Sequence, residues 1–166
     1  MITLIYGKSG SGKSLYYERL IEQEHNILYF ATLMETAETE EIIERHQSRR
    51  SGHWQFRCST GDIDIDRRKI CSAMDDMAWP RYCMIDGLMN WCIYCSYERH
   101  DYLEGAIRVA AALTDIVNTY SGDHWFILDN IRTDFYMAPI LVEAWDRLHR
   151  YLEKNITGLH IFNWEA

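Results

Sequence analysis

A glycine-rich loop near the N-terminus constrains this chain more than any other feature. It fits the pattern G-x-x-x-x-G-K-[ST] with the residues Gly7, Lys8, Ser9, Gly10, Ser11, Gly12, Lys13 and Ser14. An apolar segment typical of a strand (2–6) precedes it, and apolar residues at helical spacing (15–21) follow it. Glycines allow backbone N–H groups and a helix N-terminus to face a phosphate. We therefore predict a P-loop, in which Lys13 reaches the β- and γ-phosphates of a nucleoside triphosphate and the Ser14 hydroxyl joins a Mg²⁺ shell.

Segments with strand and helix patterns alternate along the rest of the chain. Strands are expected at 2–6, 26–32, 54–58, 82–86, 124–129 and 159–162, and helices at 15–21, 35–49, 69–78, 103–120 and 138–154. This alternation predicts an α/β fold of the RecA-like P-loop NTPase type, with a mostly parallel sheet covered by helices on both faces. We expect one domain over residues 1–166. Ligands of such sheets bind beyond the carboxyl ends of the strands. The residues that should surround one site are therefore those just after Tyr6, Thr32, Asp86 and Asp129.

The charge balance limits the partners that this chain can have. Asp and Glu number 25 against 17 Lys and Arg, which gives a formal net charge of −8. This excess of negative charge disfavours broad electrostatic capture of nucleic acid or of an anionic membrane. No apolar stretch approaches the roughly 20 residues of a membrane span, and no signal peptide is visible. We therefore expect a cytoplasmic protein.

Two other patterns are weak indicators of metal binding. Cys92 and Cys95 form a C-x-x-C, but no second ligand pair at zinc-site spacing accompanies them, so packing in the core is the favoured interpretation. The odd number of cysteines, five, is consistent with reduced thiols. The acidic run 62–66 resembles a calcium loop only superficially, because its sixth position is Arg67 instead of glycine. We expect that run to form a solvated surface loop.

Asp86 is the candidate second ligand of the Mg²⁺ ion. It closes an apolar segment (82–86) and is followed by Gly87, as the Walker-B acid of a P-loop protein is. Its carboxylate would hold Mg²⁺, directly or through water, opposite Ser14. The alternative is an ordinary helix N-cap, a common place for Asp after a strand. Asp129 competes for the metal role on the same grounds, more weakly.

A further set of residues resembles a known family. The segment Tyr29–Thr32 follows the P-loop as a Y-F-A-T strand, and His46, Arg50 and Trp54 follow at intervals of four residues. This arrangement is similar to the adenosylcobinamide kinase / adenosylcobinamide-phosphate guanylyltransferase family of cobalamin assembly. Its members open with a strand and a P-loop and continue with a Y-I-A-T strand. They then carry a histidine eight residues before a tryptophan, with an arginine midway, which is the spacing found here.

The resemblance implies a mechanism and its residues. In the family the histidine attacks the α-phosphate of GTP and carries GMP as a covalent intermediate, and neutral imidazole is a competent nucleophile. The resemblance therefore implies that His46, Lys13 and Arg50 are catalytic and that Arg49 or Arg50 offsets charge on the transferring phosphoryl group. Nucleotide contacts are expected from the whole P-loop and from Ala31, Thr32 and Arg49. Taken alone, His46 would be interpreted as an exposed helix histidine beside basic residues.

The chain also departs from the family pattern. Cys58 stands where the family has a nucleotide-binding glutamate, and Gly87 and Met89 replace a cysteine and a threonine. Residues 130–135 replace the loop N-E-V-G-x-G-I-V-P. These changes affect guanine selectivity and the corrinoid side of the site.

The partners follow from the same resemblance. It implies Mg²⁺, GTP or ATP as substrate, adenosylcobinamide as acceptor and a homotrimer, without nucleic acid. Two alternatives remain: a P-loop kinase for another small molecule, and a non-catalytic nucleotide-binding regulator that keeps the P-loop for affinity.

Overall fold

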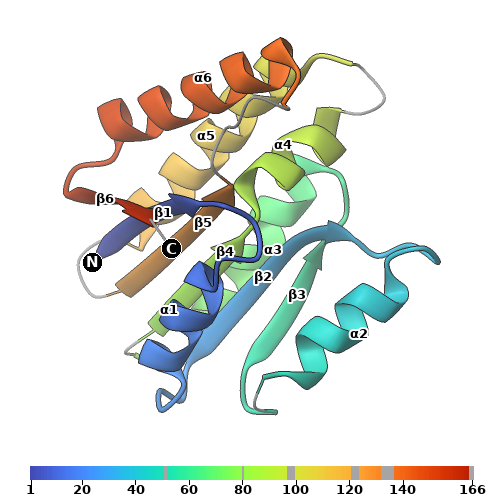
Figure 1. The fold of residues 1–166 in the computed structure, drawn as a ribbon. Coiled ribbons are helices and arrows are strands. Elements are labelled where there is room, and N and C mark those ends of the chain that lie inside the picture. The colour runs from blue at the N-terminus through green and yellow to red at the C-terminus, as the bar shows by residue number, and fades with distance from the viewer. Residues whose placement is uncertain (51, 80, 97–99, 121–123, 132–136, 165–166) are drawn as a thin grey trace.

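The computed structural model alternates strands and helices along the whole chain (Figure 1). It describes residues 1–166 except 51, 80, 97–99, 121–123, 132–136 and 165–166. The strands are β1 (Ile2–Gly7), β2 (Ile27–Met34), β3 (Gln55–Ser59), β4 (Arg81–Asp86), β5 (His124–Ile131) and β6 (Leu159–Trp164). The helices are α1 (Lys13–Ile21), α2 (Glu40–Ser48), α3 (Ile63–Asp76), α4 (Leu88–Ser96), α5 (Tyr102–Thr119) and α6 (Pro139–Asn155).

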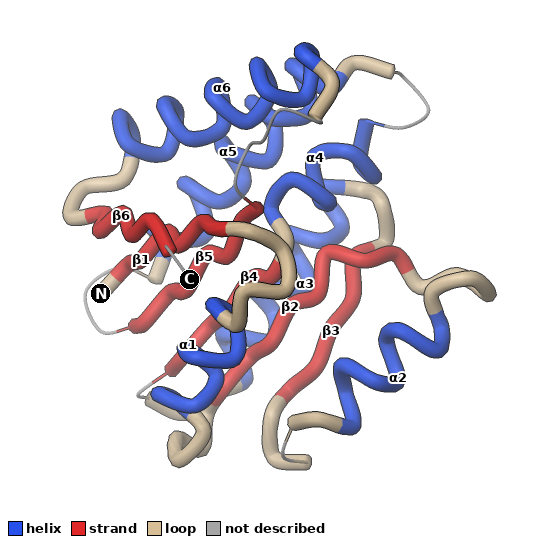
Figure 2. Tube along the Cα trace, in the orientation of Figure 1, coloured by secondary structure: helices blue, strands red, loops and turns tan. Residues whose placement is uncertain are grey.

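The described strands form one parallel sheet in the order β3-β2-β4-β5-β1-β6 (Figure 2). This confirms the predicted α/β class. Strand β5 lies between the P-loop strand β1 and strand β4, and it pairs with both. The register places Tyr6 beside Asn130, and Asp86 beside Asp129. The carboxyl ends of these central strands therefore meet at one edge of the sheet, where ligands of such folds bind.

Apolar cores on both faces of the sheet hold the helices, as predicted. One core combines side chains such as Leu4, Phe30 and Phe126 from the strands with apolar residues of α3, α4, α5 and α6. The opposite face carries a smaller core, in which Ile21 of α1 packs with strand residues such as Ile5. Central strands buried on both faces are apolar along nearly their whole length, which explains the unbroken apolar runs in the sequence.

Two segments differ from the prediction. Helix α3 begins at Ile63, within the acidic run that was expected to be a solvated loop, and that expectation was wrong. Asp62 is its N-cap, since its carboxylate accepts from the N–H groups of Asp64 and Ile65. Asp66 is fully buried and accepts from Trp91 Nε1 at 2.8 Å. Acidic side chains stabilise the first turn of a helix, so a run of Asp residues favours a helix start as well as a loop.

Helix α4 was not predicted, and it contains the C-x-x-C pair. Burial raises the pKa of the Cys95 thiol to about 12 and raises that of Cys92 further, so both thiols stay neutral. Cys92 belongs to the core, in agreement with the packing interpretation. Across the described residues, His, Cys, Asp and Glu side chains form no cluster of three or more that fits a metal ion. None of the described helices combines the length and apolar composition that crossing a bilayer requires.

Candidate functional site

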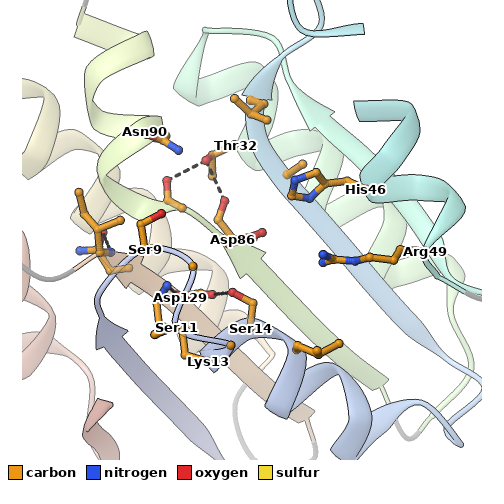
Figure 3. A pocket seen from close by; sticks show the side chains of 18 residues that line it. Ser9, Ser11, Lys13, Ser14, Thr32, His46, Arg49, Asp86, Asn90 and Asp129 are labelled. Atoms are coloured by element: carbon orange, nitrogen blue, oxygen red, sulfur yellow. Dashed lines mark hydrogen bonds and ion pairs between the residues drawn. The ribbon is translucent and has the colours of Figure 1, made fainter. Parts of the chain in front are cut away.

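A cavity of about 470 Å³ lies at the carboxyl ends of β1, β2, β4 and β5 (Figure 3). It is lined by Ser9, Gly10, Ser11, Gly12, Lys13, Ser14, Leu15, Ala31, Thr32, Leu33, His46, Arg49, Asp86, Gly87, Asn90, Asp129, Asn130 and Ile131. The lining includes most of the residues predicted from the sequence. Gly7, Lys8 and Arg50 are the predicted site residues that are not part of it.

The P-loop backbone forms one wall of this cavity. Gly10 and Gly12 have φ of 72° and 86°, in the left-handed region that glycine tolerates, and α1 begins directly after Gly12. At Gly7 a side chain would not fit, because a Cβ atom there would lie 2.9 Å from the Cβ atom of Trp164. The loop therefore has the backbone that lets N–H groups and the helix N-terminus face an anion.

Lys13 and Ser14 both contact Asp129 at the end of β5. Lys13 Nζ lies 3.3 Å from Asp129 Oδ1, and the Ser14 hydroxyl donates to Asp129 Oδ2. The Asp129 side chain is almost fully buried. Burial, and then the neighbouring charge of Asp86, raise the pKa of Asp129 to about 7 against the opposing effect of Lys13 and Ser14. Ionised Asp129 is thus a buried negative charge that its partners only partly compensate.

The oxygen atoms around this point fit a Mg²⁺ ion. Asp86 and Asp129 end neighbouring strands in register, and both line the cavity together with Ser14. Mg²⁺ prefers oxygen ligands and is usually held by one or two carboxylates together with substrate phosphates. A cation here would offset the buried charge of Asp129. The sequence indicated Ser14 and Asp86, with Asp129 as a competitor, and the structure brings the Ser14 hydroxyl to Asp129.

His46 enters the cavity from α2. Figure 3 shows His46 and Arg49 pointing toward Asp86, across the cavity from Lys13 and Ser14. Nδ1 of His46 is buried and has no hydrogen-bond partner among the described residues. Burial lowers the pKa of His46, Asp86 opposes this shift, and the nearby Arg50, Arg49 and Arg45 lower the pKa further. The imidazole is therefore kept neutral, the form that a nucleophile needs.

The two adjacent arginines both pair with Glu18 but differ in burial and in access to the cavity. Arg49 is about half exposed and lines the cavity. Arg50 is buried, with 3% of its side chain exposed, and its Nη2 lies 2.5 Å from Glu18 Oε1. It contacts Glu18 of α1 and the Tyr29 ring of β2, so of these two arginines only Arg49 lines the cavity. Sequence reasoning could not separate the two residues.

The structure adds site residues that the sequence did not indicate. Asn90 lines the cavity from α4, a helix that was not predicted. Asn130 joins three elements: its Oδ1 accepts from the N–H of Met89 at 3.0 Å, and its Nδ2 lies 3.0 Å from His149 Nε2. Thr32, which the sequence did predict, donates its hydroxyl to the carbonyl oxygens of Asp86 at 2.8 Å and Gly87 at 2.7 Å. Of the loop that departs from the family pattern, residues 132–135 lie outside the described residues.

Comparisons with known proteins identify both a family and a fold. The family model described as "Cobinamide kinase / cobinamide phosphate guanyltransferase" matches residues 3–138. No curated protein matches the chain significantly.

Three of the similar solved structures are ATPases. One of them, a structure of an ATPase domain, has a TM-score of 0.56 at 10% identity and covers 90% of this chain. A prototypical ATPase from the type III secretion system of pathogenic bacteria has a TM-score of 0.58 at 13% sequence identity, and the match covers 96% of this chain. The assembled ATPase EscN, in complex with its central stalk EscO from enteropathogenic E. coli, has a TM-score of 0.57 at 11% sequence identity. The match also covers 96% of this chain. The match spans 66%, 50% and 41% of those chains. At such low identity these likenesses establish the RecA-like fold alone.

Proposed function

The chain belongs to the cobinamide kinase / cobinamide phosphate guanyltransferase family, and on that premise we propose how its residues act. It is an enzyme of the kinase and nucleotidyltransferase type in cobalamin biosynthesis. The proposed substrates are GTP or ATP and an adenosylcobinamide acceptor, in the cytoplasm. The observation that carries this proposal is the presence of the P-loop, two carboxylates and a neutral histidine around one cavity.

For the kinase step, we assign phosphate binding to the P-loop. Its N–H groups and Lys13 hold the β- and γ-phosphates while the acceptor hydroxyl attacks the γ-phosphorus. The bond to the β-phosphate oxygen breaks to release the nucleoside diphosphate, and the hydroxyl proton passes to water. Mg²⁺, when bound, neutralises charge on these phosphates. Ser14, Asp129 and Asp86 would hold it, in keeping with their oxygen atoms around the cavity.

For the guanylyl step, we assign the nucleophile to Nε2 of His46. Its other ring nitrogen is buried, which leaves Nε2 for the substrate. Nε2 attacks the α-phosphorus of GTP, a P–N bond forms, and the bond to the β-phosphate oxygen breaks to release pyrophosphate. A phosphate oxygen of the phosphorylated acceptor then attacks the same phosphorus and releases His46. Arg49 faces the cavity and would stabilise the negative charge during both attacks.

Covalent labelling tests this assignment. The protein is incubated with Mg²⁺ and α-³²P-labelled GTP, beside the variants His46→Ala and Lys13→Ala. His160→Ala serves as the matched control, because His160 is an exposed histidine on β6. Acid-labile label should appear on the wild type and on His160→Ala and be absent from His46→Ala. Label that persists in His46→Ala would contradict the assignment of the nucleophile.

The same experiment separates the alternatives. GTP binding without label on the wild type would remove the guanylyl step and leave a kinase for another small molecule or a nucleotide-binding regulator. Consumption of ATP or GTP in the presence of adenosylcobinamide would then distinguish these two. Sedimentation of the purified protein tests the homotrimer that the resemblance implies.

A further inference from the structure

We propose that Tyr29 and Arg50 are positioning residues that hold the Asp86 carboxylate and the helix carrying His46 in one fixed arrangement. They belong to a continuous series of side-chain contacts, here called the Arg50 network, which consists of Glu18, Arg50, Tyr29 and Asp86. This inference deepens the proposed function and rests on it, because it concerns the same cavity.

Tyr29 fixes one oxygen of Asp86. It lies in β2, is fully buried, and donates its hydroxyl hydrogen to Asp86 Oδ2. Burial, together with the charge of Asp86, raises the pKa of the Tyr29 phenol well above its usual range, so the phenol remains a donor. In the register of β2 and β4, Tyr29 pairs with Met84 and Ala31 pairs with Asp86. The long phenol ring spans this diagonal, and Asp86 also lines the cavity.

The ring of Tyr29 is itself held in place. The guanidinium carbon of Arg50 lies 3.4 Å from the centre of the ring, a cation–π geometry. On β3, the Phe56 ring is stacked with the Tyr29 ring at a centroid distance of 5.5 Å. A ring fixed by two planar groups has little freedom to carry its hydroxyl away from Asp86. The position of Asp86 therefore depends on Arg50 as well as on Tyr29.

Arg50 joins α2 to the helix that follows the P-loop. Its Nη2 is paired with Glu18 on α1, one turn beyond Ser14, and its Nη1 donates to the carbonyl oxygen of His46. A cation at the C-terminal end of a helix also interacts favourably with the helix dipole. Because the Arg50 guanidinium contacts α1, β2 and α2 at once, it fixes the C-terminal end of α2 relative to the P-loop. His46 lies in that last turn.

The function of the network is thus to coordinate two parts of the site. Tyr29, at one end, positions the carboxylate proposed to hold Mg²⁺. Arg50, at the other end, positions the helix proposed to carry the nucleophile. Neither Tyr29 nor Arg50 lines the cavity. Both would act through the residues that do, as outer partners of metal ligands do in other proteins.

Tyr29→Phe isolates the hydroxyl, because the ring and its stacking remain. Binding of a fluorescent GTP analogue is titrated with Mg²⁺ and repeated in EDTA. We expect the Mg²⁺ concentration at half-saturation to rise about tenfold, the usual loss when an outer partner of a metal ligand is removed. Nucleotide affinity in EDTA should stay unchanged. Tyr120→Phe is the matched control, because it removes a tyrosine bond of 2.7 Å to a different carboxylate, Asp75, outside the cavity.

Arg50→Lys tests the other end. Lysine keeps the charge but loses the planar fork that contacts Glu18, Tyr29 and His46 together. We expect His46 labelling to slow at least about tenfold, because misplacing a reacting group by about 1 Å has a large cost in rate. Affinity for the nucleotide in EDTA should not change. Arg45→Lys is the control on the same helix, since Arg45 is exposed and pairs only with Glu41 among the described residues.

The outcomes distinguish this inference from the proposed function. A wild-type Mg²⁺ response in Tyr29→Phe, or wild-type labelling in Arg50→Lys, would overturn the inference and leave the proposed function intact. If the wild type bound the nucleotide equally tightly with Mg²⁺ and in EDTA, the metal assignment would be overturned, and this inference with it. A shifted Mg²⁺ response in Tyr29→Phe with unchanged binding in EDTA, and slowed labelling in Arg50→Lys, would support it.

Discussion

Replacement of Asp129 by asparagine should stabilise the protein in the absence of nucleotide and metal. The Asp129 side chain is 2% exposed, and burial and Asp86 raise its pKa from 3.8 to about 7. An acid with a raised pKa binds more protons in the folded state than in the unfolded state. The contribution of Asp129 to wild-type stability therefore falls as the pH rises from about 4 to about 7 and is lowest above that range.

The size of the effect follows from this pKa. Each tenfold change in an ionisation constant corresponds to about 1.4 kcal/mol, so ionised Asp129 costs the folded state about 4 kcal/mol. Relaxation of the site and entry of water reduce such costs, and we expect Asp129→Asn to be more stable than the wild type by about 2–4 kcal/mol at pH 8. At pH 5 Asp129 already carries a proton in the folded state, so most of the difference should disappear.

Urea denaturation in EDTA at pH 5, 6, 7 and 8 measures this difference directly. Comparing the two proteins at each pH cancels the titration of the groups that do not interact with Asp129. Asp76→Asn removes an exposed carboxylate from the end of α3 and should leave the pH dependence unchanged. Equal destabilisation of Asp129→Asn at pH 5 and pH 8 would contradict this prediction, because it would show that the Lys13 ion pair outweighs burial.

Two other perturbations test the packing around the site. Burial lowers the pKa of His149 to about 4. The contribution of His149 to wild-type stability should therefore fall by up to about 3 kcal/mol as the pH drops from 6.5 to 4, so the stability difference between the wild type and His149→Gln should change by that amount in urea denaturation. In α5, a Cβ atom at Gly105 would lie 1.7 Å from Ser96 Oγ. Gly105→Ala should cost about 1–3 kcal/mol in the same assay, and adding Ser96→Ala should recover part of it; an equal loss in the double variant would contradict the steric explanation.

Most of the fold could be predicted from the sequence because its signals are local. The apolar runs of the central strands and the periodicity of the helices depend on neighbouring residues, and they placed every described strand in nearly the correct position. Helix α4 was missed because both of its sides are largely apolar, with Leu88, Met89, Trp91 and Cys92 all buried. Such a helix lacks the amphipathic pattern that sequence reasoning depends on.

The phosphate-binding loop could be identified without a structure, because its eight residues are contiguous and their backbone requirements are local. Which side chains contact that loop depends on the packing of distant segments. Ser14 and Asp129 are 115 positions apart, and their contact depends on β5 lying between β1 and β4. The separation of Arg49 from Arg50 likewise depends on how α2 packs against α1 and β2. Strand order and helix packing are set by the whole core, so no short segment of sequence specifies these contacts.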